Sequence, residues 1–370
     1  MIKSEALAVS SILQMAESRA NGRPVPGHSS SSHEQYRALY IAMLVLPIVM
    51  AGCGGGGTPT GPAPGPSIYL TQDLPEGPKL LQFSTTANGI VSPTVVPGPS
   101  ANIGFSEVAV DETGNAYVGG SYINTFGPPY YVLEILVYAP GASGTQQPTK
   151  TINIGVVGFS SHGIISGLAV DSSGNVYVSG TLDFGYGVAI FSSTANGDAV
   201  PIRAIDGSAT AIIGQGPMPV AVDSADNIYV SSGDLMDDSI LIFNSSANGN
   251  VPPTSTIGGP ATTINSIQGL ALDNAGNVYV SNVPSGQNAL PDILEFSAGS
   301  TGNVAPTRII SGSATLTKVG GSLALDSAGN IYVLDVPNLL KFAPNATGNV
   351  APIAMITTAT GLIAGGIAVH

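Results

Sequence analysis

A pattern of alternating apolar and polar positions recurs along the C-terminal part of the chain. In LAVDSSGNVYV, from Leu168 to Val178, apolar residues alternate on both sides of a short polar loop, which predicts two half-buried strands joined by a tight turn. The aspartate can accept backbone N–H groups of the loop, and the glycine or asparagine after it can take a positive φ. The copies are Val108–Gly120, Leu168–Gly180, Val220–Ser232, Leu270–Asn282 and Leu323–Asp335.

A second motif follows each copy of the first. It is a short apolar strand that ends in Phe or Tyr, followed by a turn of small residues containing NG, TG or SG. The copies are Ile135–Pro140, Val188–Ser193, Ile240–Ser245, Ile293–Ala298 and Leu339–Pro344, with Leu80–Asn88 as a sixth. A further strand contains a proline, as in Val200–Ile205 and Val304–Ile309. Each unit of about 50 residues therefore predicts a four-stranded antiparallel sheet, the signature of a propeller blade.

The two ends of the repeat region complement each other. Gly365–His370 matches the first strand of a blade, whereas Ser67–Leu70 matches a second strand that lacks a first. Pairing them completes one blade and removes the open edges of the ring. We therefore expect an all-β fold: a six-bladed β-propeller of four-stranded antiparallel blades, closed by pairing the N- and C-terminal strands in one blade. The alternatives are seven blades or an open solenoid.

These units resemble the repeats of the NHL family of propellers, which read GIAVDxxGNIYVxD followed by an I-x-V-F strand. The resemblance covers Ser67–His370 and implies a propeller. It is specific for fold and weak for function, because propellers of this kind include protein-binding modules, sugar-binding modules and a few metal-dependent lyases and lactonases.

The N-terminal region carries a different signal. Ala38–Gly52 is an uncharged apolar run of 15 residues preceded by Arg37. It is short for a membrane span, which needs about 20 residues, and matches the apolar region of a signal peptide. The run ends in Met50-Ala51-Gly52-Cys53, which resembles a bacterial lipobox and implies lipidation of Cys53. The alternative is a free cysteine after an ordinary hydrophobic helix.

The predicted organisation has four segments. Residues 1–36 form a polar extension that we expect to be disordered or not translated, residues 37–53 a lipoprotein signal, residues 54–66 a Gly/Pro-rich tether, and residues 67–370 the propeller. The lipid would place the protein in a bacterial cell envelope, facing the periplasm or the exterior.

Composition narrows the possible partners. The formal net charge is −13 and only 9% of residues are charged, so a nucleic-acid partner, which needs Lys and Arg for its phosphates, is not expected. A single cysteine excludes a disulfide framework and any Cys-based zinc site. We expect a monomer that needs no cofactor and meets the membrane only through its lipid.

The predicted propeller has two unlike faces. The first-to-second and third-to-fourth turns share one face and are short and stereotyped. The second-to-third loops and the blade-to-blade loops share the other face, where variation on a rigid scaffold favours binding. Aromatic residues in these loops could form a platform for a sugar or a peptide, or could simply pack the loops together. They are Tyr122, Phe126, Tyr130, Tyr131, Phe159, His162, Phe184 and Tyr186.

The same face is acidic. Asp234, Asp237 and Asp238 crowd one loop, where their oxygens could hold calcium. The alternative is plain solvation of a protein with few charges. By contrast, the tyrosines that recur at one position of the blade are expected to pack inside it: Tyr117, Tyr177, Tyr229, Tyr279 and Tyr332.

The function favoured by the sequence is a membrane-tethered binding or scaffold module for a protein or a carbohydrate. The alternative is a metal-dependent propeller enzyme of the lyase or lactonase type. An enzyme is less favoured because the predicted propeller has only His162 and His370 as histidines and contains no G-x-S-x-G, H-E-x-x-H or phosphate-loop motif.

Overall fold

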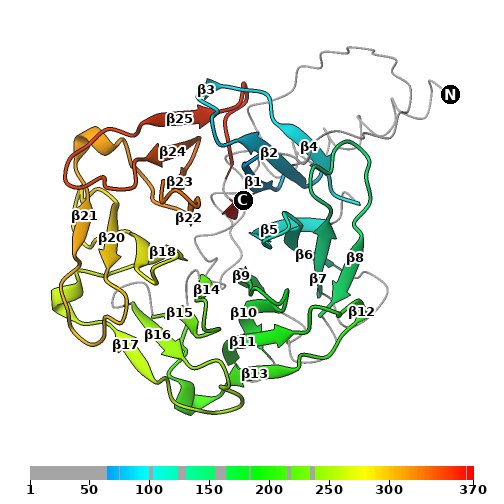
Figure 1. Cartoon of the computed structure of the whole chain (residues 1–370), viewed down its shortest axis with the longest axis horizontal. Coiled ribbons are helices and arrows are strands. Elements are labelled where there is room, and N and C mark those ends of the chain that lie inside the picture. Colours follow the sequence, from blue (N-terminus) through cyan, green and yellow to red (C-terminus); the bar gives the residue numbers. More distant parts are fainter. Residues whose placement is uncertain are drawn as a thin grey trace, which may run out of the picture. The chain divides into compact units, whose positions relative to one another are not determined.

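The structure, a computed structural model, describes most of the repeat region. The described residues are 65–74, 76–99, 103–123, 131–154, 164–182, 185–214, 218–233, 238–363 and 365–370. Their strands form six sheets arranged as blades around a central channel (Figure 1). The predicted all-β, six-bladed propeller is confirmed.

Each blade contains four antiparallel strands, which follow one another from the channel outward. Blade 1 has β26(Ile367–Val369), β1(Ser67–Gln72), β2(Lys79–Ser84) and β4(Thr94–Pro97). Blade 2 has β5(Ile103–Val110), β6(Ala116–Ile123), β7(Tyr131–Tyr138) and β8(Lys150–Asn153). Blade 3 has β9(Ile165–Val170), β10(Val176–Leu182), β11(Gly185–Phe191) and β13(Arg203–Asp206).

The remaining blades repeat this order. Blade 4 has β14(Val220–Val222), β15(Ile228–Ser232), β16(Ser239–Phe243) and β17(Ser255–Ile257). Blade 5 has β18(Ile267–Leu272), β19(Val278–Asn282), β20(Asp292–Phe296) and β21(Arg308–Ile310). Blade 6 has β22(Leu323–Leu325), β23(Ile331–Asp335), β24(Asn338–Phe342) and β25(Ala354–Thr357).

Blade 1 is completed by the end of the chain, as the half-motifs predicted. The chain end lies beside β1 near the centre of the ring in Figure 1. Tyr69 pairs with Ala368, and Ser67 and His370 exchange two backbone hydrogen bonds of 2.9 Å. The innermost strand of this blade therefore comes from a segment about 300 residues distant from its neighbour in the sequence.

The hydrophobic core lies between successive blades. The aromatic residue that ends each third strand is buried, as Phe191 and Phe243 show. The core cluster between blades 3 and 4 joins Ile190 and Ile205 of blade 3 to Val230 of blade 4. Because each blade buries one face against each neighbour, the blades stabilise one another around the ring.

The recurrent aspartates cap the turns between first and second strands, as predicted. Asp171 Oδ1 accepts the N–H groups of Ser173 and Asn175 at 2.9 and 2.8 Å, and its Oδ2 accepts the Tyr177 hydroxyl at 3.1 Å. The same bonds recur at Asp111, Asp223, Asp273 and Asp326. We call the side of the propeller that carries these turns the Asp-turn face and the opposite side the mouth face.

Neighbouring blades are also joined by backbone hydrogen bonds at the outer rim, which the sequence analysis did not predict. Each third-to-fourth turn bonds to the outer strand of the preceding blade, through a glycine with φ between 57° and 77° that an L side chain rarely adopts. Two joints are short parallel strands, β3(Gly89–Ile90) beside β25 and β12(Gly197–Asp198) beside β8. At the other four, the N–H of Gly144, Gly249, Gly302 or Gly348 donates to that strand at 2.6–2.9 Å. We call these six joints rim stitches.

Three of the blade-to-blade loops are also more regular than expected. They contain the 3₁₀ helices η1(Ser208–Thr210), η2(Pro260–Thr262) and η3(Ser313–Thr315), in which the threonine hydroxyl donates to a preceding glycine carbonyl at 2.7 Å. Within the described residues, no helix is long and apolar enough to cross a membrane.

Candidate functional site in the central channel

The structure describes part of the predicted aromatic platform. Tyr122 at the end of β6 is half-buried and packs against the core cluster between blades 1 and 2. Tyr186 on β11 is 38% exposed on the mouth face. For Tyr131 only the backbone is described, as the first residue of β7. The other residues lie outside the described ranges: Phe126, Tyr130, Phe159, His162 and Phe184. The platform therefore stays a prediction.

The predicted calcium loop is described at one residue. Asp238 is buried, and its Oδ2 accepts the N–H of Ile267 at 2.8 Å, which ties blade 4 to the inner strand of blade 5. Asp234 and Asp237 lie outside the described residues, as does Cys53. Among the residues that are described, no group of three or more His, Cys, Asp or Glu side chains could hold a metal ion.

Other carboxylates of the mouth face hold the protein's own loops. Asp335, at the end of β23, accepts the N–H groups of Lys318, Val319 and Gly320 at 2.8–3.1 Å. Asp292 accepts the Asn282 amide at 2.8 Å, and burial, only partly offset by that bond, raises the pKa of its carboxyl to about 6. These acids are structural, because their oxygens serve backbone and amide donors.

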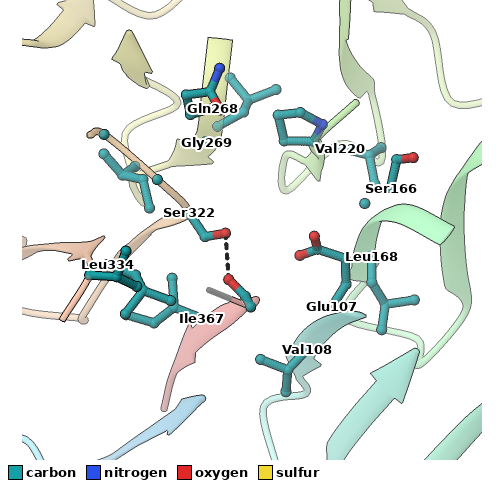
Figure 2. Close-up of a pocket in the computed structure, with 18 of the residues that line it drawn as sticks. Glu107, Val108, Ser166, Leu168, Val220, Gln268, Gly269, Ser322, Leu334 and Ile367 are labelled. Atoms are coloured by element: carbon teal, nitrogen blue, oxygen red, sulfur yellow. Dashed lines mark hydrogen bonds between the residues drawn. The ribbon is translucent and has the colours of Figure 1, made fainter. Parts of the chain in front are cut away.

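A cavity of about 240 Å³ lies in the central channel, where the six inner strands converge (Figure 2). One branched aliphatic residue from every blade lines it: Val108, Leu168, Val220, Leu270, Leu323 and Ile367. These residues lie three positions before the turn aspartate or its equivalent, so they occupy the same level of the channel. They form an apolar floor on the side of the cavity nearer the Asp-turn face.

The preceding position on each inner strand distinguishes the blades. It is Glu107, Gly167, Pro219, Gly269, Ser322 and Gly366 in blades 2, 3, 4, 5, 6 and 1, so glycine occurs in alternate blades. A Cβ atom on Gly366 would lie 2.6 Å from the Val108 nitrogen, and one on Gly269 would lie 2.6 Å from the Leu323 nitrogen. The glycines are therefore required by close approach of neighbouring inner strands.

Glu107 is the ionisable residue of this ring, and the only one among the described residues that line the cavity. Its carboxylate points into the cavity in Figure 2. The side chain is partly buried in the channel wall, and desolvation raises the pKa of the Glu107 carboxyl to about 8. Ser322 lies across the channel and donates its hydroxyl to the Gly365 carbonyl at 2.9 Å.

Glu107 was missed in the sequence because the recognised motif begins at the next residue, Val108. Aligning the six inner strands one position further upstream would have revealed one acid among glycine, proline and serine.

Large apolar residues are exposed on the mouth face. They come from blade-to-blade and second-to-third loops and, for Tyr186, from the start of β11, and Val319 also lines the cavity. We call this set the collar: Ile164, Tyr186, Ile213, Leu290, Leu316, Val319 and Ile363. The other exposed large apolar residues of the described chain lie on the outer rim, in or beside the third-to-fourth connections: Ile90, Val200, Ile202, Ile353 and Met355. Both faces therefore carry exposed apolar residues, but on the Asp-turn face they lie at the rim, away from the aspartate turns.

Comparisons with known proteins agree with the class of fold, a six-bladed propeller. No family model matches the chain, and no curated protein matches it. A protein of unknown function from Bacteroides caccae has a similar structure, with 10% identity over 82% of this chain and 98% of that one and a TM-score of 0.52. The Malassezia sympodialis allergen Mala s 1 is similar at 12% identity over 73% of this chain and 83% of that one, with a TM-score of 0.50. Likeness at this level of identity shows the fold alone.

Proposed function

We propose that this protein is a binding or scaffold module for a protein or a carbohydrate, held at the surface of a bacterial membrane by a lipid on Cys53. The observation that carries the binding function is the channel cavity, together with the exposed apolar residues of the mouth face. Val319 belongs to both, whereas the turn aspartates of the other face have their oxygens bonded within their own turns, as at Asp171. Exposed apolar patches on monomers often mark binding surfaces.

The lining of the cavity favours binding over catalysis. Among the described lining residues, Glu107 is the single group that can exchange a proton, and its neighbours are aliphatic, glycine or neutral polar residues. A lyase or lactonase of the metal-dependent kind would need several ligands around the channel. Metal analysis of the purified protein distinguishes the two functions, because one zinc or calcium ion per chain would favour the enzyme.

The tether and the location rest on the sequence. Met50-Ala51-Gly52-Cys53 supports lipidation, and the Gly/Pro-rich residues 54–66 would leave the propeller free to turn above the membrane. The aspartate turns and the aromatic-ended third strands support membership of the NHL-like propellers, a resemblance that describes the fold of the module more than its ligand.

Substitution of the cysteine tests the tether. Cys53→Ser should move the protein from the membrane fraction to the soluble fraction and abolish incorporation of labelled palmitate. The melting temperature of the propeller should stay unchanged, because β1 begins only at Ser67. A variant that remains in the membrane fraction at the wild-type level contradicts the lipid tether.

A matched pair of substitutions tests the binding face. Ile213 of the collar is 58% exposed, and Ile353 of the outer rim is 56% exposed. On a combined glycan and peptide array, Ile213→Ser should weaken the signals that the wild-type protein gives, whereas Ile353→Ser should leave them unchanged. An array on which the rim variant loses binding and the collar variant keeps it would contradict a site on the mouth face.

A further inference from the structure

We propose that the channel cavity receives a cationic side chain, an ammonium or a guanidinium, from an apolar segment of a partner protein that lies on the collar. This inference rests on the proposed binding function of the mouth face. It names the occupant from three properties of the site: the charge of the cavity, the order of its layers and the kind of apolar surface around it.

Charge complementarity points to a cation. The chain carries 10 Lys and Arg against 23 Asp and Glu. Most basic side chains of the described propeller are engaged elsewhere. Lys150, Arg203, Arg308 and Lys341 donate to turn carbonyls of the next blade, and Lys79 pairs with Glu76. No basic side chain of the described residues lines the cavity, so a charge opposite Glu107 would have to come from outside.

The layers of the cavity match a long basic side chain. From the mouth inward, the wall passes from Val319 through the level of Glu107 and Ser322 to the aliphatic floor. An aliphatic stem could pass Val319 and Leu334 while its charged head stops at the Glu107 carboxylate. Lysine and arginine have this form, an apolar stem with a charged tip.

The collar offers apolar contacts to a peptide. Its described residues are aliphatic except for Tyr186. Isoleucine, leucine and valine pack well against apolar peptide side chains, whose burial provides about 25 cal/mol per Å². A basic residue flanked by apolar residues would therefore contact both parts of the site.

The ionisation of Glu107 should be linked to occupancy. Desolvation alone raises the pKa of this carboxyl, since β9, β14, β18, β22 and β26 contribute no charged side chain to the described lining. Behind the wall, Asp335 is occupied by the N–H groups of residues 318–320, which include Lys318, the charged residue next to Val319. A cation in the cavity would favour the carboxylate and release a proton from Glu107.

The experiment uses butylguanidinium, the end of an arginine side chain, with 1-pentanol as an uncharged control. Binding to the full chain in detergent solution is followed by saturation-transfer NMR between pH 6 and 9. Guanidinium stays charged throughout this range, so a change in its affinity reports the protein. Its affinity should rise about tenfold per pH unit up to about pH 8 and then level off, because only the carboxylate form of Glu107 binds it.

The variant Glu107→Gln keeps the shape of the side chain and removes its charge. At pH 8.5 it should bind butylguanidinium about tenfold or more weakly than the wild-type protein, in line with a charge-assisted hydrogen bond, while binding of 1-pentanol is equal in both. The pH profile of the wild-type protein tests the inference independently if the variant does not fold.

Two outcomes overturn the inference. Equal binding of butylguanidinium to wild type and Glu107→Gln, or a flat pH profile, removes the cation site while the array result for Ile213→Ser still decides the binding function. Cation binding at Glu107 with no effect of Glu107→Gln on array peptides that contain Lys or Arg shows a site for small cations and rejects the peptide occupant.

Discussion

The two ends of the inner strands differ in how they use carboxylates. At the Asp-turn end, five blades carry an aspartate whose oxygens are bonded within the turn. At the mouth end, one blade carries Glu107 and the equivalent positions hold glycine, proline or serine. The aspartate recurs in the first-to-second turns of five blades because each of these turns needs an acceptor for its backbone N–H groups. Glu107 occurs in one blade only, so the blade fold does not require a carboxylate at that position.

Folding shifts the carboxyl pKa in opposite directions at the two ends of the inner strand of blade 2. Desolvation pushes the pKa of Asp111 upward, but hydrogen bonds from Asn115 and Thr113 outweigh it and leave the pKa below its usual value. The ionised form of Asp111 is therefore stabilised by folding. For Glu107, desolvation raises the pKa to about 8 with no offsetting hydrogen bond from the described residues, so folding disfavours its ionised form. A residue that costs stability and breaks the repeat of a regular scaffold is a candidate for function.

Removing β26, the strand that closes the ring, should have the largest effect on stability, because this inner strand runs from the mouth end of the channel to the Asp-turn end. Deletion of Gly365–His370 removes β26 from blade 1, together with Gly365 and Ile367 of the cavity wall. The ring would open and expose two strand edges, so we expect loss of the cooperative thermal transition seen by circular dichroism. An unchanged melting temperature after this deletion would show that the ring does not depend on the joined termini.

Replacing a turn aspartate should have the next largest effect. Asp171→Ala removes four hydrogen bonds and leaves buried donors without acceptors, which should lower the free energy of unfolding by about 2–4 kcal/mol. Urea denaturation measures this loss. Asp171→Asn keeps one acceptor oxygen and should lose less. If the alanine variant unfolds within about 0.5 kcal/mol of wild type, the turn bonds are not what the repeated aspartate provides to each blade.

Neutralising Glu107 should have the opposite sign and depend on pH. The unfolded chain releases this proton near pH 4.5, but the folded protein holds it until about pH 8, so the unfolded state binds fewer protons between these values. The contribution of Glu107 to stability therefore falls as pH rises through this window. At pH 8.5 the free energy of unfolding of Glu107→Gln should exceed that of the wild-type protein by about 1–3 kcal/mol, a range that allows for solvent screening of the partly exposed carboxylate. Below pH 4.5 the two proteins should be similarly stable.

This comparison requires urea denaturation of both proteins at pH 4.5, 7 and 8.5. Other carboxylates titrate equally in both proteins, so only the difference between them reports Glu107. A difference that is constant across the three pH values would mean that desolvation does not disfavour the Glu107 carboxylate.

The smallest effect is expected in the collar, where two adjacent isoleucines provide an internal control. Ile213 is exposed, whereas Ile212 is buried in the core between blades 3 and 4. Ile213→Ser should change the free energy of unfolding by less than about 0.5 kcal/mol, and Ile212→Ser should cost about 3 kcal/mol. Similar losses in both variants would show that the collar is part of the core.

The fold could be predicted because each of its requirements is local and repeated. The five residues from Asp171 to Asn175 are enough to predict the turn that they form, and five copies of this motif define the repeating unit. Closure was predictable for a related reason, since Gly365–His370 and Ser67–Leu70 are recognisable halves of the same unit. Repetition allowed the sequence to be compared with itself.

The cavity could not be predicted in the same way, because it forms where one position from each of six blades meets the others. Glu107 has the chemistry of an ordinary surface glutamate until its neighbours are known. Asp238 illustrates the same limit, since its hydrogen bond to the N–H of Ile267, 29 residues away, could not be read from the sequence, while its role as a calcium candidate stays a prediction. Ile212 and Ile213 are adjacent and of the same residue type, yet Ile212 is buried and Ile213 is exposed. The packing of blades 3 and 4 decides this difference.

The rim stitches bear on how such a protein could arise. Each unit carries a glycine turn that bonds backward and an outer strand that receives the turn of the following unit, so every unit brings one half of two joints. Duplication of one unit from a turn aspartate to the next, such as Asp223 to Asp273, would create a new pair of compatible rim-stitch ends. Gene duplication could therefore lengthen the array one blade at a time while a channel residue such as Glu107 diverged alone.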